Sequence, residues 1–381
     1  MDLTVRLGMS NVRAYEVVIG VIGVLAVMEL CRRAVGIPIL CVAGGFMIYA
    51  LYYYFFTKSL GASGAVRNLA ISLFYRVQGG GIMGTPVQVC SKFIIVFIIF
   101  GAFLERTGIS QFFIDLANSL VGRFSGGPAK VAVISSALCG MVSGSSVGNT
   151  VTTGSVTIPM MKKTGYKPEF AGAVEAASST GGQIMPPIMG AAAFLMAEYL
   201  GIPYIEVAAK AIIPAFLYFA GIFITVHLEA KKLGLQGIPR NELPKWSYLA
   251  KNCYLVIPLV LLVWLVASGT RTMAVSAALS IAGAFVIGYI NFFLTELRER
   301  EEGETIGSVF KSVTKLALVT AYEALQAGAK SCVAVAVACA MAGMIAGCIT
   351  VTGLASKLIT AVVSASSRAV LIDPTLIALF L

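Results

Sequence analysis

Residues 140–190 read GMVSGSSVGNTVTTGSVTIPMMKKTGYKPEFAGAVEAASSTGGQIMPPIMG, and this stretch decides how the rest of the chain is interpreted. Its apolar runs are interrupted by small, polar and helix-breaking residues at 143–150 and again at 178–187. Inside a bilayer, unpaired backbone N–H and C=O groups are costly, so non-helical backbone persists only where protein buries it or water reaches it. Two breaks so close together therefore predict a binding site for a polar solute.

The composition is that of an integral membrane protein. Of the 381 residues, 58% are hydrophobic and only 12% are charged, and apolar runs of about 18 residues or more recur along the chain. The net charge of +10 gathers in short links between these runs, which indicates membrane orientation and not nucleic-acid binding. The eight cysteines include no CxxC pair and there is one histidine, so neither a metal centre nor a disulfide framework is expected.

The apolar runs divide the chain into five expected segments. These are two membrane helices in residues 1–58, an interfacial arm helix with its link at 59–83, a first repeat at 84–245, a central helix pair at 246–304, and the start of a second repeat at 305–381. Within the last segment, residues 310–326 are expected to form an interfacial helix and residues 327–349 a separate span.

Basic residues flank the run at 128–162 on both sides, with Arg123 and Lys130 at its start and Lys162, Lys163 and Lys167 at its end. Positive residues mark the cytoplasmic side of a membrane. Both ends are therefore placed in the cytoplasm, and the break at 143–150 becomes the tip of a re-entrant helical hairpin. Residues 168–200 are expected to form a second discontinuous element, a helix that opens at 179–187.

An internal repeat links the two ends of the chain. Thr107-Gly108, followed by an amphipathic stretch at 109–120, recurs as Thr352-Gly353 followed by 354–365, and Pro128 has a counterpart in Pro374. Counting loops gives the second copy the opposite direction through the membrane, which is the inverted-repeat logic of secondary transporters. The predicted fold is an all-α polytopic membrane protein with helical hairpins and broken helices, whose second repeat is incomplete.

The two breaks suit a cation and an anion together. An unwound helix offers backbone carbonyls to sodium, and hydroxyl and amide side chains complete its shell. Half-helix amino termini near Thr150 and after Pro187 favour the negative charge of a small carboxylate substrate. The expected substrate-binding and cation-binding residues are Ser143, Gly144, Ser145, Ser146, Asn149, Thr150, Ser179, Thr180, Gly181, Gly182, Gln183 and Pro186, with sodium held in the region of Ser145, Asn149 and Thr180.

Several of these features have structural alternatives. The glycine spacing across 140–148 also suits close helix packing, and Pro186-Pro187 also suits a simple helix kink. Glu175 lies mid-membrane, where an ionisable side chain is a candidate for proton or ion coupling; the alternative is that it pairs with a neighbour or faces cytoplasmic water. His227, near a helix end, is expected to be structural.

Residues 140–190, continued by AAAFLMAE at 191–198 and VHLEA at 226–230, resemble the large membrane subunit of tripartite ATP-independent periplasmic (TRAP) transporters. The likeness is strongest to fused permeases that work with TAXI-type solute receptors, and GGQIMPP at 181–187 carries it most specifically. Residues 15–56 look like the last two helices of the small membrane subunit. The resemblance implies truncation at both ends of the chain.

The same resemblance implies an elevator-type importer in a bacterial or archaeal cytoplasmic membrane. It would take up small organic acids delivered by a periplasmic TAXI-type solute-binding protein, with sodium as the coupling ion and no other cofactor. The competing functions are a membrane-embedded enzyme, a channel and a non-transporting permease fragment. The sequence contains no HExxH, paired-aspartate or P-loop motif, and its histidine is isolated from any Ser or Cys motif, so we expect no enzyme and no nucleic-acid partner.

Overall fold

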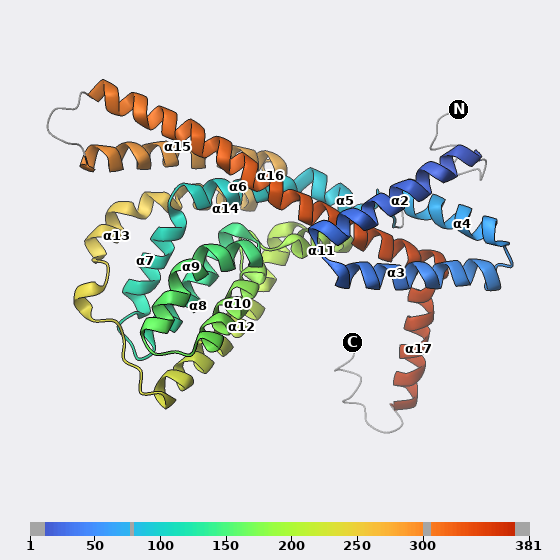
Figure 1. Ribbon diagram of the computed structural model, residues 1–381, viewed down its shortest axis with the longest axis horizontal. Coiled ribbons are helices and arrows are strands. Elements are labelled where there is room, and N and C mark those ends of the chain that lie inside the picture. Colours follow the sequence, from blue (N-terminus) through green and yellow to red (C-terminus); the bar gives the residue numbers. More distant parts are fainter. Residues whose placement is uncertain (1–11, 77–79, 300–305, 370–381) are drawn as a thin grey trace. The chain divides into compact units, whose positions relative to one another are not determined.

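The computed structural model describes residues 12–76, 80–299 and 306–369, and every regular element in these ranges is helical (Figure 1). Seven stretches of the described residues are long and apolar enough to cross a membrane, at 14–34, 37–57, 85–106, 204–232, 240–267, 273–297 and 310–352. The prediction of an all-helical, polytopic membrane protein is therefore confirmed.

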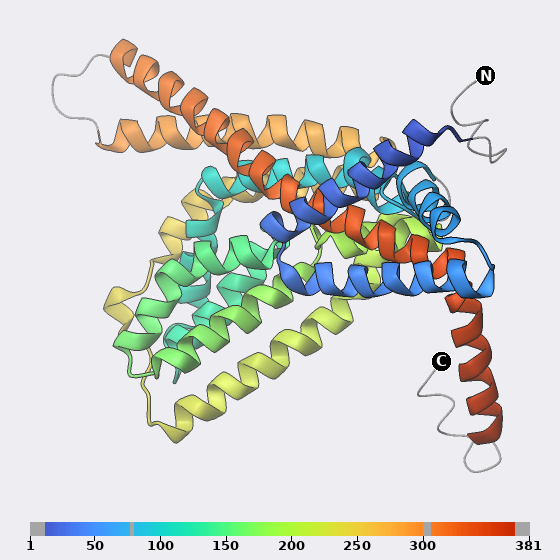
Figure 2. The same ribbon diagram turned by 45° about the vertical axis from the view of Figure 1, so that its right-hand side comes forward.

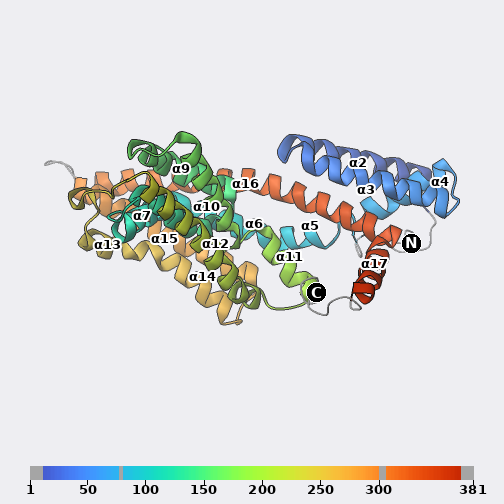
Figure 3. The same cartoon turned by 90° about the horizontal axis from the view of Figure 1, so that it is seen from below.

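The chain divides into two compact units, of which the first comprises residues 1–91 and 333–381. Its helices α2 (Ala14–Ala34), α3 (Ile37–Tyr52) and α4 (Ala62–Ala70) lie side by side (Figure 3). Gly36 makes the turn between α2 and α3 with φ at 116°, a conformation that favours glycine. Pro38 then begins α3, where the missing N–H of proline is not needed.

The core of this first unit joins residues far apart in the sequence. Leu69 and Leu73 pack into one apolar cluster with Met341 and Met344 of α16 (Ile306–Thr352). The remaining elements with residues in this unit are the π-helices η1 (Tyr53–Thr57) and η2 (Ile71–Tyr75), α5 (Thr85–Val89), the π-helix η3 (Cys90–Ile94), which runs into the second unit, and α17 (Leu354–Ala369).

The second unit, residues 92–332, holds both breaks. Here α6 (Ile95–Arg106) turns at Gly108 into α7 (Ile109–Val121), which leads to the two arms of a helical hairpin, α8 (Gly127–Ser143) and α9 (Ser146–Lys163). Helix α10 (Pro168–Gly181) packs against both arms, and α12 (Tyr204–Lys232) packs against α8 and α10 (Figure 1). The short η4 (Gly182–Ile184) and α11 (Ala191–Leu200) lie between α10 and α12 in the sequence.

The rest of the second unit is a set of long apolar helices. They are α14 (Ile257–Ala267) and α15 (Met273–Glu299), preceded by the short η5 (Arg240–Glu242), α13 (Trp246–Asn252) and η6 (Cys253–Val256). The first part of α16 runs back along α15 (Figure 2), where the Tyr289 hydroxyl lies 3.1 Å from Oγ1 of Thr314.

Asn291 of α15 fixes the turn between α6 and α7. Its side-chain N–H donates to the carbonyl of Thr107 at 3.1 Å, and its side-chain oxygen accepts from the Tyr254 hydroxyl at 2.7 Å. Gly288 lies beside the same turn, because a Cβ there would come within 2.7 Å of the Thr107 side chain. The corner that leads into the hairpin is thus held against α15 by directional bonds and by close backbone approach.

Residues 310–349 differ from the expectation of an interfacial helix followed by a separate span. They all belong to one continuous helix, α16, which has 47 residues. Gly328 is the main candidate for a break, yet a single glycine costs a helix only about 1 kcal/mol. It has a packing role instead, since a Cβ at Gly328 would lie 3.2 Å from the backbone of Ile99.

The two Thr-Gly turns have the same local form. Gly108 precedes α7 with φ at 94°, and Gly353 precedes α17 with φ at 63°. Both are left-handed conformations that favour glycine. The proposed counterpart of Pro128, Pro374, lies outside the described residues, so the inverted repeat stays a prediction.

Candidate functional site

The first break is a tight two-residue turn. Gly144 ends α8 in a left-handed conformation with φ at 59°, and its N–H donates to the carbonyl of Gly140 at 2.9 Å. Ser145 then caps α9, with its hydroxyl oxygen accepting from the N–H of Gly148 at 3.2 Å. Serine is a preferred residue at this position because it satisfies an otherwise free donor of the first helical turn. The tip therefore closes with its own local bonds.

The predicted tip at 143–150 was too wide. Helix α9 starts at Ser146 and not near Thr150, so only residues 144 and 145 are non-helical. The hydroxyl of Thr150 bonds back to the carbonyl of Ser146 at 2.8 Å, within its own helix.

The second break lies three residues later than predicted. Helix α10 continues through Ser179 and Thr180 to Gly181, and the chain leaves the α-helical form from residue 182 to residue 190. The expected opening at 179–187 is corrected accordingly. The N–H of Gly190 donates to the carbonyl of Gln183 at 2.7 Å, which closes the break into a loop before α11.

Distant partners hold this second break. The N–H of Ile188 donates to the carbonyl of Met141 on α8 at 3.2 Å. The Tyr204 hydroxyl, at the start of α12, donates to the carbonyl of Pro187 at 2.7 Å and accepts from the N–H of Met189 at 3.3 Å. The buried backbone of the break is thus satisfied by residues from two other helices, as a non-helical segment inside a membrane requires.

The two breaks meet. Gly140 and Gly182 are in backbone contact, because a Cβ on Gly140 would lie 2.3 Å from Cα of Gly182. Across the same junction, the side-chain N–H of Gln183 donates to the Ser146 hydroxyl at 2.8 Å. The glycine spacing at 140–148 therefore serves both of its interpretations, close packing at Gly140 and a turn at Gly144.

Two buried side-chain oxygen atoms near the breaks have no hydrogen-bond partner among the described residues: Oδ1 of Asn149, in the first turn of α9, and Oγ of Ser178, one turn before Gly182 in α10. Asn149 is 1% exposed, and its amide N–H donates to the carbonyl of Ser136 at 2.8 Å. A Cβ on Gly182 would lie 3.2 Å from that amide nitrogen, so Asn149 is next to the contact between the breaks. Buried polar atoms are normally paired, and an unpaired oxygen in such a place is suited to an ion or a solute.

Glu175 is fully buried in α10, about two turns before the second break. Its Oε1 accepts from Ser136 of α8, Thr153 of α9 and Ser179 of α10, at 3.0, 2.5 and 3.0 Å, and its Oε2 accepts from Thr157 of α9 at 2.5 Å. Of the two structural alternatives expected, pairing with a neighbour fits these hydrogen bonds, whereas facing water does not, and the coupling role stays a prediction. Hydroxyl groups from three helices surround the carboxyl group, and its exposed fraction is zero.

The predicted site residues fall into two groups. Those that meet at the junction are Ser146, Asn149, Gly182 and Gln183, with Gly144, Ser145 and Ser143 forming the tip beside them. Thr150 and Thr180 are turned to their own helices; the Thr180 hydroxyl donates to the carbonyl of Ala176 at 2.7 Å and the residue is exposed. Gly181 packs against Tyr218, and Ser179 points to Glu175. Pro186 lies in the second break.

Sequence reasoning missed the hydroxyl groups around Glu175 and the unpaired Ser178. A signal for them was present. Asn149, Thr153 and Thr157 are spaced four residues apart, as are Glu175 and Ser179, and residues four apart share one face of a helix. Polar residues at that spacing inside an apolar helix indicate a buried polar face.

A second polar cluster, called here the hairpin base, lies near the start of the hairpin. Lys130 is 4% exposed, and its ammonium group lies 3.0 Å from Nδ1 of His227. The ammonium also lies 5.4 Å from the ring centroid of Phe223 and 5.9 Å from that of Phe124. His227 thus takes the structural role that was expected of it, as an acceptor for a buried lysine.

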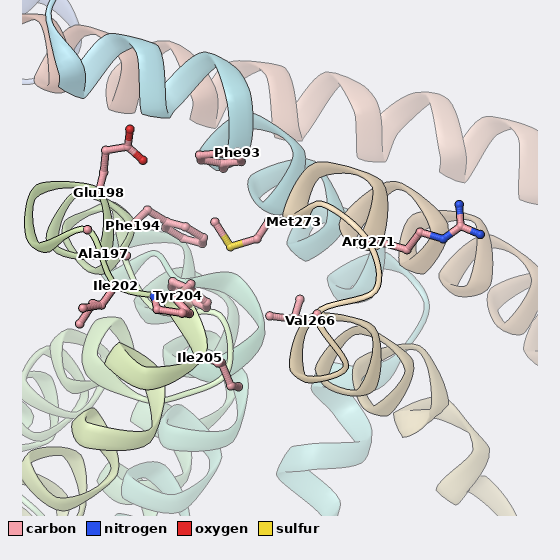
Figure 4. Close-up of a pocket in the computed structure, with 13 residues that line it drawn as sticks. Phe93, Phe194, Ala197, Glu198, Ile202, Tyr204, Ile205, Val266, Arg271 and Met273 are labelled. Carbon is pink, nitrogen blue, oxygen red and sulfur yellow. The ribbon is translucent and has the colours of Figure 1, made fainter.

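A cavity of about 410 Å³ opens beside α11 and α12 (Figure 4). Phe93, Phe194, Tyr204 and Met273 line it, while the charged end of Arg271 extends away from it. Tyr204 stacks on Phe194 with centroids 4.4 Å apart. The cavity is therefore aromatic, and it shares Tyr204 with the second break.

A helical hairpin and a broken helix whose breaks meet, with buried unpaired oxygens on the helices that form them, are the arrangement expected of a polytopic membrane permease. Residues 22–381 match the model of the family described as "Tripartite ATP-independent periplasmic transporter, DctM component". The chain belongs to this TRAP large permease family, and it is a multi-pass protein of the cytoplasmic membrane.

Curated relatives agree with this assignment. The C4-dicarboxylate TRAP transporter large permease protein DctM of Pseudomonas aeruginosa is 27% identical over 244 residues, which cover 61% of this chain and 55% of the relative. The sialic acid TRAP transporter permease protein SiaT of Haemophilus influenzae is 27% identical over 236 residues, covering 60% and 36%. The sialic acid large permease protein SiaM of Vibrio cholerae is 25% identical over 195 residues, covering 51% and 45%.

The chain spans about half the length of the curated relatives that it matches first. These relatives are named as transporter permeases and not as enzymes, in agreement with the expectation from the sequence.

Proposed function

We propose that the chain is the permease component of a secondary active importer that couples the uptake of small organic acids to sodium. The observation that carries the proposal is the contact between the two breaks, together with two buried, unpaired oxygens on the helices that form them, Oδ1 of Asn149 in α9 and Oγ of Ser178 in α10. Sodium is bound in transporters by such oxygen atoms together with the carbonyls of unwound helices. Backbone oxygens at residues 144 and 182–190 supply the second kind of ligand.

The geometry favours an anionic substrate at the same place. Helix α9 begins at the tip of the hairpin, and α11 begins directly after Gly190. The two helix starts are close together, because a Cβ on Gly190 would lie 3.5 Å from the carbonyl oxygen of Gly144. Helix amino termini attract negative charge through their free N–H groups and their dipole. Neither break contains Arg or Lys, so the cation and the two helix ends balance a carboxylate.

The names of the relatives support the same substrate class as the site does. C4-dicarboxylates and sialic acid are both carboxylic acids, and the relatives named for them share about a quarter of their aligned residues with this chain. A small organic acid is therefore the proposed solute. It is delivered by a periplasmic solute-binding protein of the TAXI type, and residues 15–56 act as the small-subunit part of a fused permease.

Movement in this proposal is of the elevator type. The hairpin, α10 and the second break are joined by side-chain and backbone bonds from Ser146, Ile188 and Glu175, which suits transport as one body. The alternative coupling ion is a proton taken up by Glu175, the role expected of it from its position in the sequence.

Sodium-dependent thermal stability of the purified protein tests this proposal without knowledge of the solute. Unfolding is followed in sodium chloride and in potassium chloride at equal ionic strength. At about ten times its dissociation constant, a ligand that binds only the folded state stabilises it by about 1.4 kcal/mol. A higher melting temperature in sodium supports the proposal, and uptake of C4-dicarboxylates and sialic acid into proteoliposomes with the receptor then identifies the solute. Identical melting in both salts contradicts sodium coupling.

A further inference from the structure

We propose that Glu175 is the positioning residue of the cation site: it holds α10 in place against both arms of the hairpin and does not itself bind the ion. The inference rests on the proposed function, which placed a cation at Asn149 and Ser178. It assigns Glu175 a role different from proton or ion coupling.

The contacts of Glu175 join all the helices that form the site. Ser136 belongs to α8, Thr153 and Thr157 to α9, and Ser179 to α10, and the hydroxyl groups of all four donate to one carboxyl group. The carboxyl group also packs closely on α9, because a Cβ on Gly154 would lie 3.0 Å from Cγ of Glu175. One side chain therefore fixes the distance of α10 from both arms of the hairpin.

This cluster adjoins Asn149 through Thr153 and Ser136. Thr153 is one turn from Asn149, and its hydroxyl is within 2.8 Å of the Asn149 carbonyl as well as being bonded to Glu175. Ser136 holds the Asn149 amide through its backbone carbonyl and Glu175 through its hydroxyl. Because the amide N–H is held by Ser136, the Oδ1 atom faces the other way and stays unpaired.

Glu175 also acts along α10. Ser179 is one turn further along this helix and donates to Oε1, which fixes the turn that carries its neighbour Ser178. Neither Oδ1 of Asn149 nor Oγ of Ser178 has a partner among the described residues, so both oxygens are available to a cation.

Two substitutions separate positioning from the alternatives. In Glu175→Gln the amide keeps the shape of the carboxyl group. Its oxygen still accepts on the Oε1 side, and its N–H can donate to the Thr157 hydroxyl, which then donates to the carbonyl of Thr153, already at 3.0 Å. In Glu175→Ala every one of these bonds is lost, so only the second substitution releases α10 from the hairpin.

The experiment measures the sodium concentration that gives half of the full thermal stabilisation. Loss of a residue that orients metal ligands weakens metal binding by about 10-fold to 100-fold, so Glu175→Ala should raise this concentration at least about tenfold. Glu175→Gln should stay within about threefold of the unmodified protein, since the bond network is preserved. An equal loss in both variants would show that the charge itself is required and would overturn positioning. An unchanged midpoint in Glu175→Ala, with only a lower melting temperature, would also overturn it.

A second experiment measures the distance between the two breaks by disulfide cross-linking, so it depends neither on sodium nor on the melting temperature of a single variant. Cysteines replace Ser146 and Gln183, whose side chains meet across the junction at 2.8 Å, and the linked peptide is quantified by mass spectrometry after mild oxidation. Adding Thr157→Val or Glu175→Ala should lower the yield, whereas adding Glu175→Gln should leave it unchanged. If the unmodified protein shows no sodium effect while this pattern holds, the proposed function fails and the positioning role stands. Equal yields in all variants would refute the positioning role alone.

Discussion

The two breaks solve the same problem, the pairing of non-helical backbone within the packed protein, in opposite ways. The hairpin tip is closed by bonds within residues 140–148, from Gly144 to its own helix and from Gly148 to the Ser145 cap. The second break, at 182–190, depends on Met141 and Tyr204, which are far from it in the sequence. The tip is therefore a local motif, whereas the second break exists only in the packed protein.

This difference predicts how each break responds to change. A substitution at the tip removes one local bond, and the neighbouring turns of α8 and α9 remain intact. A substitution at the contact between the breaks, or at a distant partner of the second break, disturbs several helices together. The largest effects should therefore come from the junction, the next from Tyr204, and the smallest from the tip.

The largest effect is expected for Gly140→Ala. The added Cβ would lie 2.3 Å from Cα of Gly182, where backbone must move to make room. Overpacking of this kind destabilises by about 3 kcal/mol, and it should also abolish sodium-dependent stabilisation because the two breaks separate. The control is Gly172→Ala in α10, where no atom lies within 4 Å of the new Cβ. Thermal unfolding of both variants checks this, and equal stability would contradict the close contact.

Tyr204→Phe tests whether the second break depends on its distant partner. The change leaves the stacked ring but removes the bonds to the Pro187 carbonyl and the Met189 N–H. Leaving buried backbone groups unpaired costs about 2 kcal/mol. Hydrogen exchange at residues 185–190 should speed up while exchange in α9 is unchanged. The exposed Tyr322→Phe is the control, and slow exchange in both variants would show that the break holds itself.

Comparing Gly144→Ala with Gly201→Ala separates two contributions to the loss of stability at the tip: the strain of the left-handed backbone conformation and the contact of the new Cβ with neighbouring atoms. Both glycines have φ near +60°, at 59° and 63°, but only Gly144 has neighbours, the carbonyls of Met189 and Ile188 at 3.0 and 3.1 Å from a new Cβ. The left-handed conformation alone costs about 1 kcal/mol, which Gly201→Ala should show in thermal unfolding. Gly144→Ala should exceed it by a few tenths of a kcal/mol, and the reverse order would indicate that the tip is loosely packed against the second break.

The smallest effect is expected for Ser145→Ala. It removes the cap of α9, whose oxygen accepts from Gly148, at a cost of about 1 kcal/mol or less. The matched control is Ser155→Ala, an exposed serine in the same helix. Chemical denaturation of the two variants gives the difference. A loss as large as that of Tyr204→Phe would mean that the tip is not locally closed, and the contrast between the breaks would disappear.

The same contrast explains what the sequence could predict. The hairpin was predictable because its signals are local, with basic residues at both ends and a Ser-Gly-Ser tip. Its width was overestimated because Ser146 and Thr150 look like loop residues, yet the Thr150 hydroxyl bonds back to its own helix and lets α9 start early. The second break was found by its prolines and glycines but was placed three residues too early, since Ser179 and Thr180 are held in α10 by bonds to Glu175 and Ala176.

The other features of the site could not be predicted, because they depend on contacts that leave no local pattern in the sequence. The pairing of Gly140 with Gly182, the role of Tyr204 and the hydroxyl groups around Glu175 all join segments that are adjacent only after packing. The spacing of Asn149, Thr153 and Thr157 was visible, but a polar helix face without a known partner does not say what it faces. In α16, the expected division into residues 310–326 and 327–349 was wrong, because the helix continues through this boundary, where Gly328 packs against the backbone of Ile99.

The hairpin base also contains a spectroscopic probe that is native to the chain. His227 is the sole histidine of the sequence, so selective isotope labelling of histidine yields one imidazole signal with no assignment step. Because the Lys130 ammonium can only donate, Nδ1 of His227 must be the bare ring nitrogen and the hydrogen must reside on Nε2. That tautomer has a distinctive nitrogen chemical shift, and its loss would report in real time that the first arm of the hairpin has moved away from α12.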